Sequence, residues 1–323
     1  MPIAGSSDAL LGTATAVGSA MLWAFSSPML AAAVKRYGPT SINLYKSVVS
    51  AALFLVTMAL WIGPGAFSQA SASLPWFALS GVVGLAIGDT AYFVSLGRLG
   101  PSLALILYQL STVFGVLLGM LFRGEKPGTM QLLGTALVIG GVTFATVRRS
   151  AAVAADESAA DRDARRSRTI GIVGGLISSV CQAVGLLINQ KAWDAAEAAG
   201  FARSAPSSSS MAAAARMAAT ALALGLALVV LRRFKAEARP LVEKEGWKLT
   251  FLPAVLGTYL GILSMQVAIA NLSLGVASTL LATSPIFVIP AAWLLAGEKP
   301  TMRKTVGALV ATGGVALISL SGG

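Results

Sequence analysis

The chain carries one long pattern twice. Gly84–Phe144 aligns with Gly257–Leu317 at a constant offset of 173 positions and without a gap. A Gly-Glu-Lys-Pro tetrapeptide starts at Gly124 and again at Gly297. The same offset superposes further glycines: Gly84 on Gly257, Gly134 on Gly307, and Gly140-Gly141 on Gly313-Gly314. The rest of the match is mostly apolar on apolar, which predicts two copies of one membrane unit, as in many carriers that build a central site.

Composition supports a membrane location. Of 323 residues, 56% are hydrophobic and 11% are charged, whereas soluble domains contain roughly 25% charged residues. The hydrophobic runs are close to 20 residues long, which is enough for a helix to cross a bilayer core of roughly 30 Å. They lack the period-two alternation of outer-membrane barrels. We therefore expect an all-α integral membrane protein, located as a multi-pass protein in the inner (plasma) membrane.

The apolar runs and the helix breakers between them predict ten transmembrane helices. The expected spans are 11–34, 41–62, 74–97, 101–123, 128–147, 170–193, 210–231, 248–272, 275–297 and 302–320. Residues 1–147 form a first five-helix repeat, 148–169 a flexible linker and 170–323 a second five-helix repeat. Because five is an odd number, the second repeat is expected to be inverted relative to the first.

Several classes of function are excluded by residue types. The chain has no histidine, which rules out imidazole metal sites, histidine proton relays and histidine-dependent triads. The single cysteine, Cys181, rules out an internal disulfide. No nucleotide-binding loop, metal-ligand cluster, nucleophile elbow or pair of catalytic carboxylates is recognisable. We expect no catalytic residue, no metal and no cofactor, and the oligomeric state stays open.

Basic residues predict an orientation. The net charge is +11, which in a membrane protein is better explained by loop lysines and arginines than by nucleic-acid binding. The linkers after the odd-numbered spans contain 18 of them, and the termini and other loops contain 4. The positive-inside rule then places the 148–169 linker in the cytoplasm and both termini outside.

Few ionisable residues lie within the expected spans, where a charge costs roughly 2.5–3.5 kcal/mol at a helix centre on insertion scales. Lys46 and Arg216 hold matching places in spans two and seven, and either contact an anionic substrate group, extend to the interface or form an internal ion pair. Asp89 has no counterpart, since Ile262 aligns with it. Asp89 is therefore a candidate for proton coupling, with pairing to Lys46 or Arg98, or a water-facing position, as alternatives.

Polar and aromatic residues within the spans predict a pocket for a neutral or zwitterionic solute. Amide side chains in lipid need partners, so they are expected to face the bundle or a watery cavity, and helix–helix hydrogen bonds are the alternative explanation for each. The predicted substrate-binding residues are Trp23, Lys46, Tyr92, Tyr108, Gln109, Gln182, Arg216, Tyr259 and Gln266.

These motifs resemble those of the EamA-type permeases of the drug/metabolite transporter superfamily. The resemblance rests on Trp23 in the first helix, Lys46 and Arg216 early in the second helix of each copy, Ser284-Pro285, and the Gly297-Glu298 turn. The first copy departs from it with Ser111-Thr112 in place of the proline, and the second with Gln182 in place of the tryptophan. The resemblance implies a ten-helix carrier with inverted repeats, alternating access and a central cavity. Many members keep both termini in the cytoplasm, opposite to the orientation that the basic residues predict.

The sequence therefore favours a secondary transporter that exports a small polar or amphipathic metabolite, such as an amino acid or a related compound. Its expected partners are a small-molecule substrate and the lipid bilayer, and not nucleic acid. A nucleotide-sugar or organic-phosphate exchanger, with Lys46 and Arg216 as anion ligands, is the alternative within transport. A membrane-embedded enzyme or a non-transporting membrane subunit is the alternative of another class.

Overall fold

The computed structural model describes residues 6–62, 71–124, 126–146, 159–200, 206–272 and 274–321, and the regular secondary structure in these ranges is helical throughout. The first five spans are α1 (Ser6–Tyr37), α2 with η1 (Pro39–Thr57, Met58–Ile62), α4–η2–α5 (Leu74–Ser80, Gly81–Ile87, Gly88–Leu99), α6–α7 (Pro101–Tyr108, Leu110–Arg123) and α8 (Thr129–Thr146). The second five are α9 (Ala159–Ala198), α10 (Pro206–Val230), α13–η3–α14 (Lys244–Pro253, Ala254–Leu260, Gly261–Asn271), α15–α16 (Leu274–Leu281, Ser284–Ala296) and α17 (Met302–Ser321). Two short helices, α11 (Phe234–Glu237) and α12 (Arg239–Val242), join α10 to α13.

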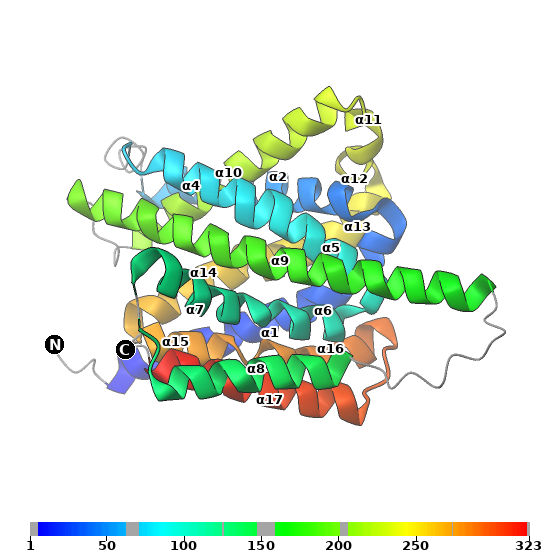
Figure 1. Ribbon diagram of the computed structural model, residues 1–323. Coiled ribbons are helices and arrows are strands. Elements are labelled where there is room, and N and C mark those ends of the chain that lie inside the picture. The colour runs from blue at the N-terminus through cyan, green and yellow to red at the C-terminus, as the bar shows by residue number, and fades with distance from the viewer. Residues whose placement is uncertain are drawn as a thin grey trace.

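Ten crossings result from these elements. Nine helices in the described ranges are long and apolar enough to span a membrane. The remaining crossing, span nine, is made by the two shorter helices α15 and α16, which follow one another in the chain. In Figure 1 the first helix of the chain starts at the face where α17 ends, whereas α9 starts at the opposite face. The predicted all-α membrane fold of two inverted five-helix repeats is confirmed.

The turns between spans explain the recurring glycines. Gly38 and Gly100 have φ of 91° and 84°, and each is followed by a proline that opens the next helix. Gly124 and Gly297, the first residues of the two Gly-Glu-Lys-Pro turns, end α7 and α16 in the left-handed conformation, with φ of 66° and 65°. A left-handed residue after a helix favours glycine because other side chains are strained there.

The second of these turns joins the two repeats. Glu298 accepts a hydrogen bond from Lys304 Nζ at 2.7 Å and a longer one from the backbone N–H of Ser102 at 3.4 Å. Gly100 leaves no room for a Cβ beside the Glu298 carboxylate. A carboxylate at a helix N-terminus satisfies free N–H groups and the helix dipole. Glu298 of the second repeat therefore caps α6 of the first. The matching Glu125 lies outside the described residues.

Helix irregularities follow the repeat as well. The π-helical segments η2 (81–87) and η3 (254–260) are separated by the same offset of 173. Span four is interrupted at Gln109 and span nine at Ala282-Thr283, again at matching positions. The two interruptions meet, because Gln109 Nε2 donates to the Ala282 carbonyl at 3.2 Å. Interrupted helices at the interface of two repeats are characteristic of transporter sites.

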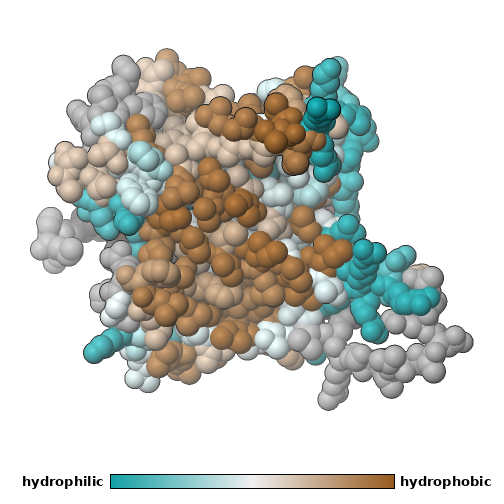
Figure 2. All heavy atoms as spheres, turned by 45° about the horizontal axis from the view of Figure 1, so that its top comes forward, coloured by the Kyte–Doolittle hydropathy of each residue, from teal (hydrophilic) through white to brown (hydrophobic). Residues whose placement is uncertain are grey.

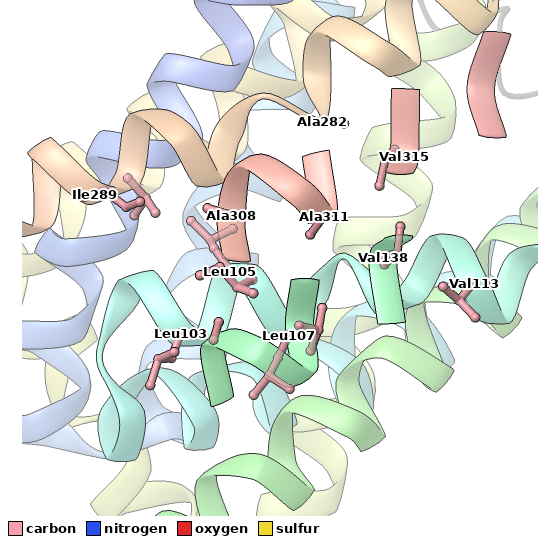
Figure 3. Close-up of a cluster of buried hydrophobic side chains, with 14 of the residues drawn as sticks. Leu103, Leu105, Leu107, Val113, Val138, Ala282, Ile289, Ala308, Ala311 and Val315 are labelled. Carbon is pink, nitrogen blue, oxygen red and sulfur yellow. The ribbon is translucent and has the colours of Figure 1, made fainter. Parts of the chain in front are cut away.

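The largest buried cluster lies where the fourth and fifth helices of both repeats pack together. It includes Leu105 and Leu107 of α6, Val138 of α8, and Ala311 and Val315 of α17 (Figure 3). The first helix of each repeat also packs on the third span of the other, α1 on α13–η3–α14 and α9 on α4–η2–α5. The repeats are thus interleaved, so a site between them draws on both.

The surface divides into an apolar belt and a basic face. Figure 2 shows a broad hydrophobic area, bordered at one end by hydrophilic residues. Exposed apolar side chains such as Leu121, Phe122 and Leu226 belong to lipid-facing helices. We call the end that holds the α1–α2 turn, α11, α12 and the start of α17 the basic face. It is the end that the positive-inside rule predicts to be cytoplasmic.

The predicted linker is partly wrong. Residues 147–158 lie outside the described part, but α9 already begins at Ala159 and continues through Thr169 into the membrane span. Alanines and arginines favour helix formation, and the exposed residues from Asp161 to Arg166 extend α9 beyond the apolar belt. The apolar pattern marks only the membrane part of such a helix, so the sequence criterion missed its polar start.

The Gly-Gly pairs generate a prediction. A Cβ on Gly141 would lie 2.6 Å from Ala311 N, and one on Gly314 would lie 2.6 Å from Gly134 O. A Cβ on Gly140 or Gly313 would meet nothing within 4 Å. We expect Gly141→Ala and Gly314→Ala to lower the apparent melting temperature by several degrees, because α8 and α17 must separate.

The neighbouring glycines provide matched controls for this test. Gly140→Ala and Gly313→Ala should be neutral or slightly stabilising, since alanine is the better helix former by about 1 kcal/mol. Thermal unfolding in detergent measures all four variants. Equal effects at both positions of a pair would contradict the packing of α8 on α17.

Candidate functional site

A cavity of about 190 Å³ lies between the two repeats, and both π-helical segments contribute to its lining, η2 with Leu85 and η3 with Gly257 and Thr258. A π-helical turn widens a helix and frees backbone carbonyls, and such turns are frequent at functional sites. The cavity is lined from both repeats by Trp23, Ser26, Ser27, Leu30, Lys46, Leu85, Asp89, Tyr92, Phe93, Leu105, Tyr108, Gln182, Met217, Gly257, Thr258 and Ile262.

The polar end of the cavity is built around Asp89. Its Oδ2 forms an ion pair with Lys46 Nζ, and its Oδ1 accepts a hydrogen bond from Gln182 Nε2 at 2.7 Å. The Lys46 and Asp89 side chains are only 6% and 15% exposed. Of the partners predicted for Asp89, the structure places Lys46 beside it, whereas Arg98 contacts Ser167. Both carboxylate oxygens are thus engaged, by α2 of the first repeat and α9 of the second.

The backbone next to Asp89 is held by Asn43. Its Nδ2 donates to the carbonyls of Leu85 and Ala86 at 2.8 and 3.2 Å and lies 2.9 Å from Thr90 Oγ1. Gln182 donates in addition to the Gly84 carbonyl at 2.9 Å. The sequence interpretation missed Asn43, although it is an amide in an apolar span one helical turn before Lys46. Asn43 fixes the end of the π-helical segment η2, directly before the first turn of α5 that carries Asp89.

Aromatic side chains form the other wall. Tyr92 hydroxyl and Ser27 Oγ lie 2.9 Å apart, and the rings of Tyr92 and Tyr108 meet edge to face at 5.8 Å. Trp23 lies against Gly261, where a Cβ would overlap its indole. Together with Leu105 and the other apolar lining residues, these rings give the cavity an amphipathic character.

A second cavity, of about 430 Å³, adjoins the first and shares Trp23 and Tyr108 with it. Much of its lining comes from α7 and from the later halves of α9 and α17, and these helices end at the face opposite the basic face. Gln109 and Ser111 line this larger cavity. The site thus leads toward the face of the termini, whereas Glu298 joins the repeats at the basic face.

The predicted site residues do not all gather in one place. Trp23, Lys46, Asp89, Tyr92, Tyr108 and Gln182 line the smaller cavity, and Gln109 lines the larger one. Tyr259 lines neither, because its hydroxyl lies 2.5 Å from Thr57 Oγ1 and its ring packs on Phe54. Gln266, on α14, is also away from both. Arg216 also lines neither cavity. It lies behind the lining, close enough to Asp89 and Tyr108 to interact with them electrostatically.

Residues that sequence inspection could not single out complete the lining. Leu85, Leu105, Met217, Thr258 and Ile262 are ordinary membrane residues by type, and only the packing of the two repeats brings them to the cavity. Ile262 offered one signal, since it is the repeat counterpart of Asp89. The pair makes one side of the site charged and the other apolar.

Comparison with known proteins identifies the architecture. The model of the EamA-like transporter family matches residues 10–147 and 169–320. A curated protein of Streptantibioticus cattleyicolor, "Probable terminal-alkyne amino-acid exporter", is 29% identical over 130 residues, which are 39% of this chain and 41% of that protein. The chain thus matches about two fifths of that relative's length. A crystal structure of a protein with 16% sequence identity has the same fold, with a TM-score of 0.61 over 98% of this chain and 97% of that one.

The Asp89 cluster generates a prediction about stability. Asp89→Asn leaves the Lys46 charge buried without an acid, and removing one partner of a buried ion pair costs about 3–5 kcal/mol. We expect a clear loss of thermal stability in detergent, and a recovery of much of it when Lys46→Met is added.

Glu245→Gln serves as the control, because it removes one exposed acid near the basic face. It should leave the melting temperature unchanged. An Asp89→Asn protein as stable as wild type, or a double variant less stable than either single variant, would show that Asp89 and Lys46 do not neutralise each other's charge.

Proposed function

The chain belongs to the EamA-like transporter family, and we propose that this multi-pass membrane transporter exports a small amphipathic metabolite, such as an amino acid or a related compound, across the inner (plasma) membrane. Family membership indicates a transporter of small molecules rather than an enzyme. The exporter name of the partial relative supports the direction and the substrate class.

The observation that carries this proposal is the amphipathic cavity between the inverted repeats. Its polar end holds Lys46, Asp89 and Gln182, and its other walls are mostly aromatic or aliphatic, with the hydroxyls of Ser26, Ser27 and Thr258 among them. A volume of about 190 Å³ lies below the roughly 300–1,000 Å³ typical of pockets for drug-sized ligands. A metabolite with a charged head and a short apolar body matches both features.

Alternating access is the mechanism that the arrangement supports. The larger cavity leads from Trp23 and Tyr108 toward the face of the termini, and Glu298 connects the repeats at the basic face. Rocking the repeats about their shared interface would open the basic face and close the other one. Asp89, which lines the smaller cavity, is the group through which we propose that protons are coupled to export.

The organic-phosphate alternative is less well supported. Lys46 is already neutralised by Asp89, so near the cavity the described residues would offer a doubly charged phosphate one further cation, Arg216. A phosphate site normally combines several positive groups and N–H donors. We therefore do not favour an exchanger of sugar nucleotides or organic phosphates.

Reconstituted vesicles test the proposal. Wild-type protein in vesicles loaded with a defined mixture of amino acids, sugars, nucleotide sugars and organic phosphates should release neutral amino acids or close relatives, measured by mass spectrometry of the outside medium. Release should respond to an imposed pH gradient. Movement of the phosphorylated compounds alone would favour the alternative, and movement of nothing would contradict an exporter.

A matched pair of variants ties the flux to this cavity. Ile262→Trp fills the lining and should reduce release at least tenfold. Leu260→Trp, two residues away on an exposed position of the same span, should leave it unchanged. Equal flux through both variants would place the substrate route elsewhere.

A further inference from the structure

We propose, on the basis of the exporter function above, that the substrate carries a carboxylate and that Arg216 is the residue that binds it. The charged groups of the site, the packing of α10 and the difference between the two repeats lead to this assignment.

The α10 backbone is fixed beside the cavity. Thr220 Oγ1 donates to the Gly81 carbonyl at 3.0 Å and to the Arg216 carbonyl at 2.8 Å. Gly81 lies so close to the Arg216 backbone that a Cβ on it would overlap that backbone. Arg216 Nη2 approaches Gly84, where it lies 3.6 Å from the position of a Cβ. The guanidinium is therefore held against η2, and the next residue, Met217, lines the cavity.

Arg216 has a charge that the described residues do not neutralise directly. Among the described residues, Lys46, Asp89 and Arg216 are the lysine, arginine and acidic side chains that lie well inside the spans. Asp89 gives one carboxylate oxygen to Lys46 and the other to Gln182. The buried Nε of Arg216 has no hydrogen-bond partner. Because a buried charge without a partner is costly, the site lacks one anionic group.

A comparison of the two repeats shows which basic residue lacks an acidic partner. Lys46 and Arg216 are counterparts, and Lys46 has Asp89 as its acid partner. The counterpart of Asp89 in the second repeat is Ile262, which cannot supply a charge. A substrate carboxylate would give Arg216 the partner that Asp89 gives Lys46.

The chemistry of the site favours a carboxylate over other anions. One excess positive charge matches one carboxylate, and a planar guanidinium binds a carboxylate through two parallel N–H donors. The apolar lining, including Leu30, Leu105 and Ile262, fits an aliphatic tail. The inferred substrate class is thus a small monocarboxylate with an apolar body, which includes the aliphatic amino acids.

Three matched probes test the inference in vesicles that contain the full-length protein. Leucine carries an ammonium group and a carboxylate, leucinamide lacks the carboxylate, and 4-methylpentanoate lacks the ammonium group. Wild type should exchange leucine and 4-methylpentanoate, and leucinamide at least about tenfold more slowly, because a site built for a polar group rejects an analogue that lacks it.

Substitutions of Arg216 test whether this residue binds the carboxylate. Arg216→Gln should abolish the preference for the carboxylate probes, and Arg216→Lys, which keeps the charge but not the two-pronged geometry, should retain part of it. Lys299→Gln removes an exposed charge and should behave like wild type. Thermal unfolding identifies a variant that fails to fold, in which case the wild-type preference alone decides the substrate class.

Each remaining outcome counts against the inference. Equal exchange of leucine and leucinamide by wild type would overturn it and leave an exporter without a carboxylate requirement. A carboxylate preference that persists in folded Arg216→Gln would overturn the role of Arg216. If the vesicles move other metabolites but none of the three probes, the inference fails and the exporter function stands. If they move nothing, both fail.

Discussion

A carboxylate in the interior of a membrane bundle has to be neutralised where it stands, and Asp89 imposes this requirement on the rest of the site. Lys46 of α2 and Gln182 of α9 satisfy its two oxygens, so one helix from each repeat must meet span three at that depth. Asn43 then holds the end of the π-helical segment that directly precedes Asp89. The cavity lies where these three elements converge, and its polar end is a consequence of neutralising Asp89.

The two inverted repeats give the site a symmetric arrangement of helices, and the positions at which the repeats differ make its two sides chemically unlike. Matching π-helical segments and matching helix interruptions bring the two halves together, with Gln109 donating to its own repeat counterpart, Ala282. Two substitutions then make the halves unlike: Asp89 opposite Ile262, and Gln182 opposite Trp23. We propose that this symmetric frame, with one charged and one apolar wall, would hold an amphipathic solute in a defined orientation.

Much of the frame could be predicted from the sequence because its signals are local. Apolar runs, glycine turns and the constant offset predict the spans and the inversion of the second repeat without knowledge of side-chain contacts, whereas the interleaving of the repeats becomes visible only in the structure. The partner of Asp89 could not be chosen between Lys46 and Arg98, since only tertiary packing separates them. The interruption at Gln109 has no proline to mark it, unlike that before Pro285. Tyr259 has the residue type of a pocket residue, but its hydroxyl is engaged by Thr57.

Cysteine accessibility from the two faces tests most directly whether one central site opens alternately to each side. In a Cys181→Ser background, Ser111→Cys reports on the larger cavity and Ser102→Cys on the Glu298 contact at the basic face. Without solute, an impermeant thiol reagent should label only Ser111→Cys, from the face of the termini. A transported solute should lower that labelling and expose Ser102→Cys to reagent on the basic face. Simultaneous labelling at both positions, or labelling that no solute changes, would contradict alternating access around this site.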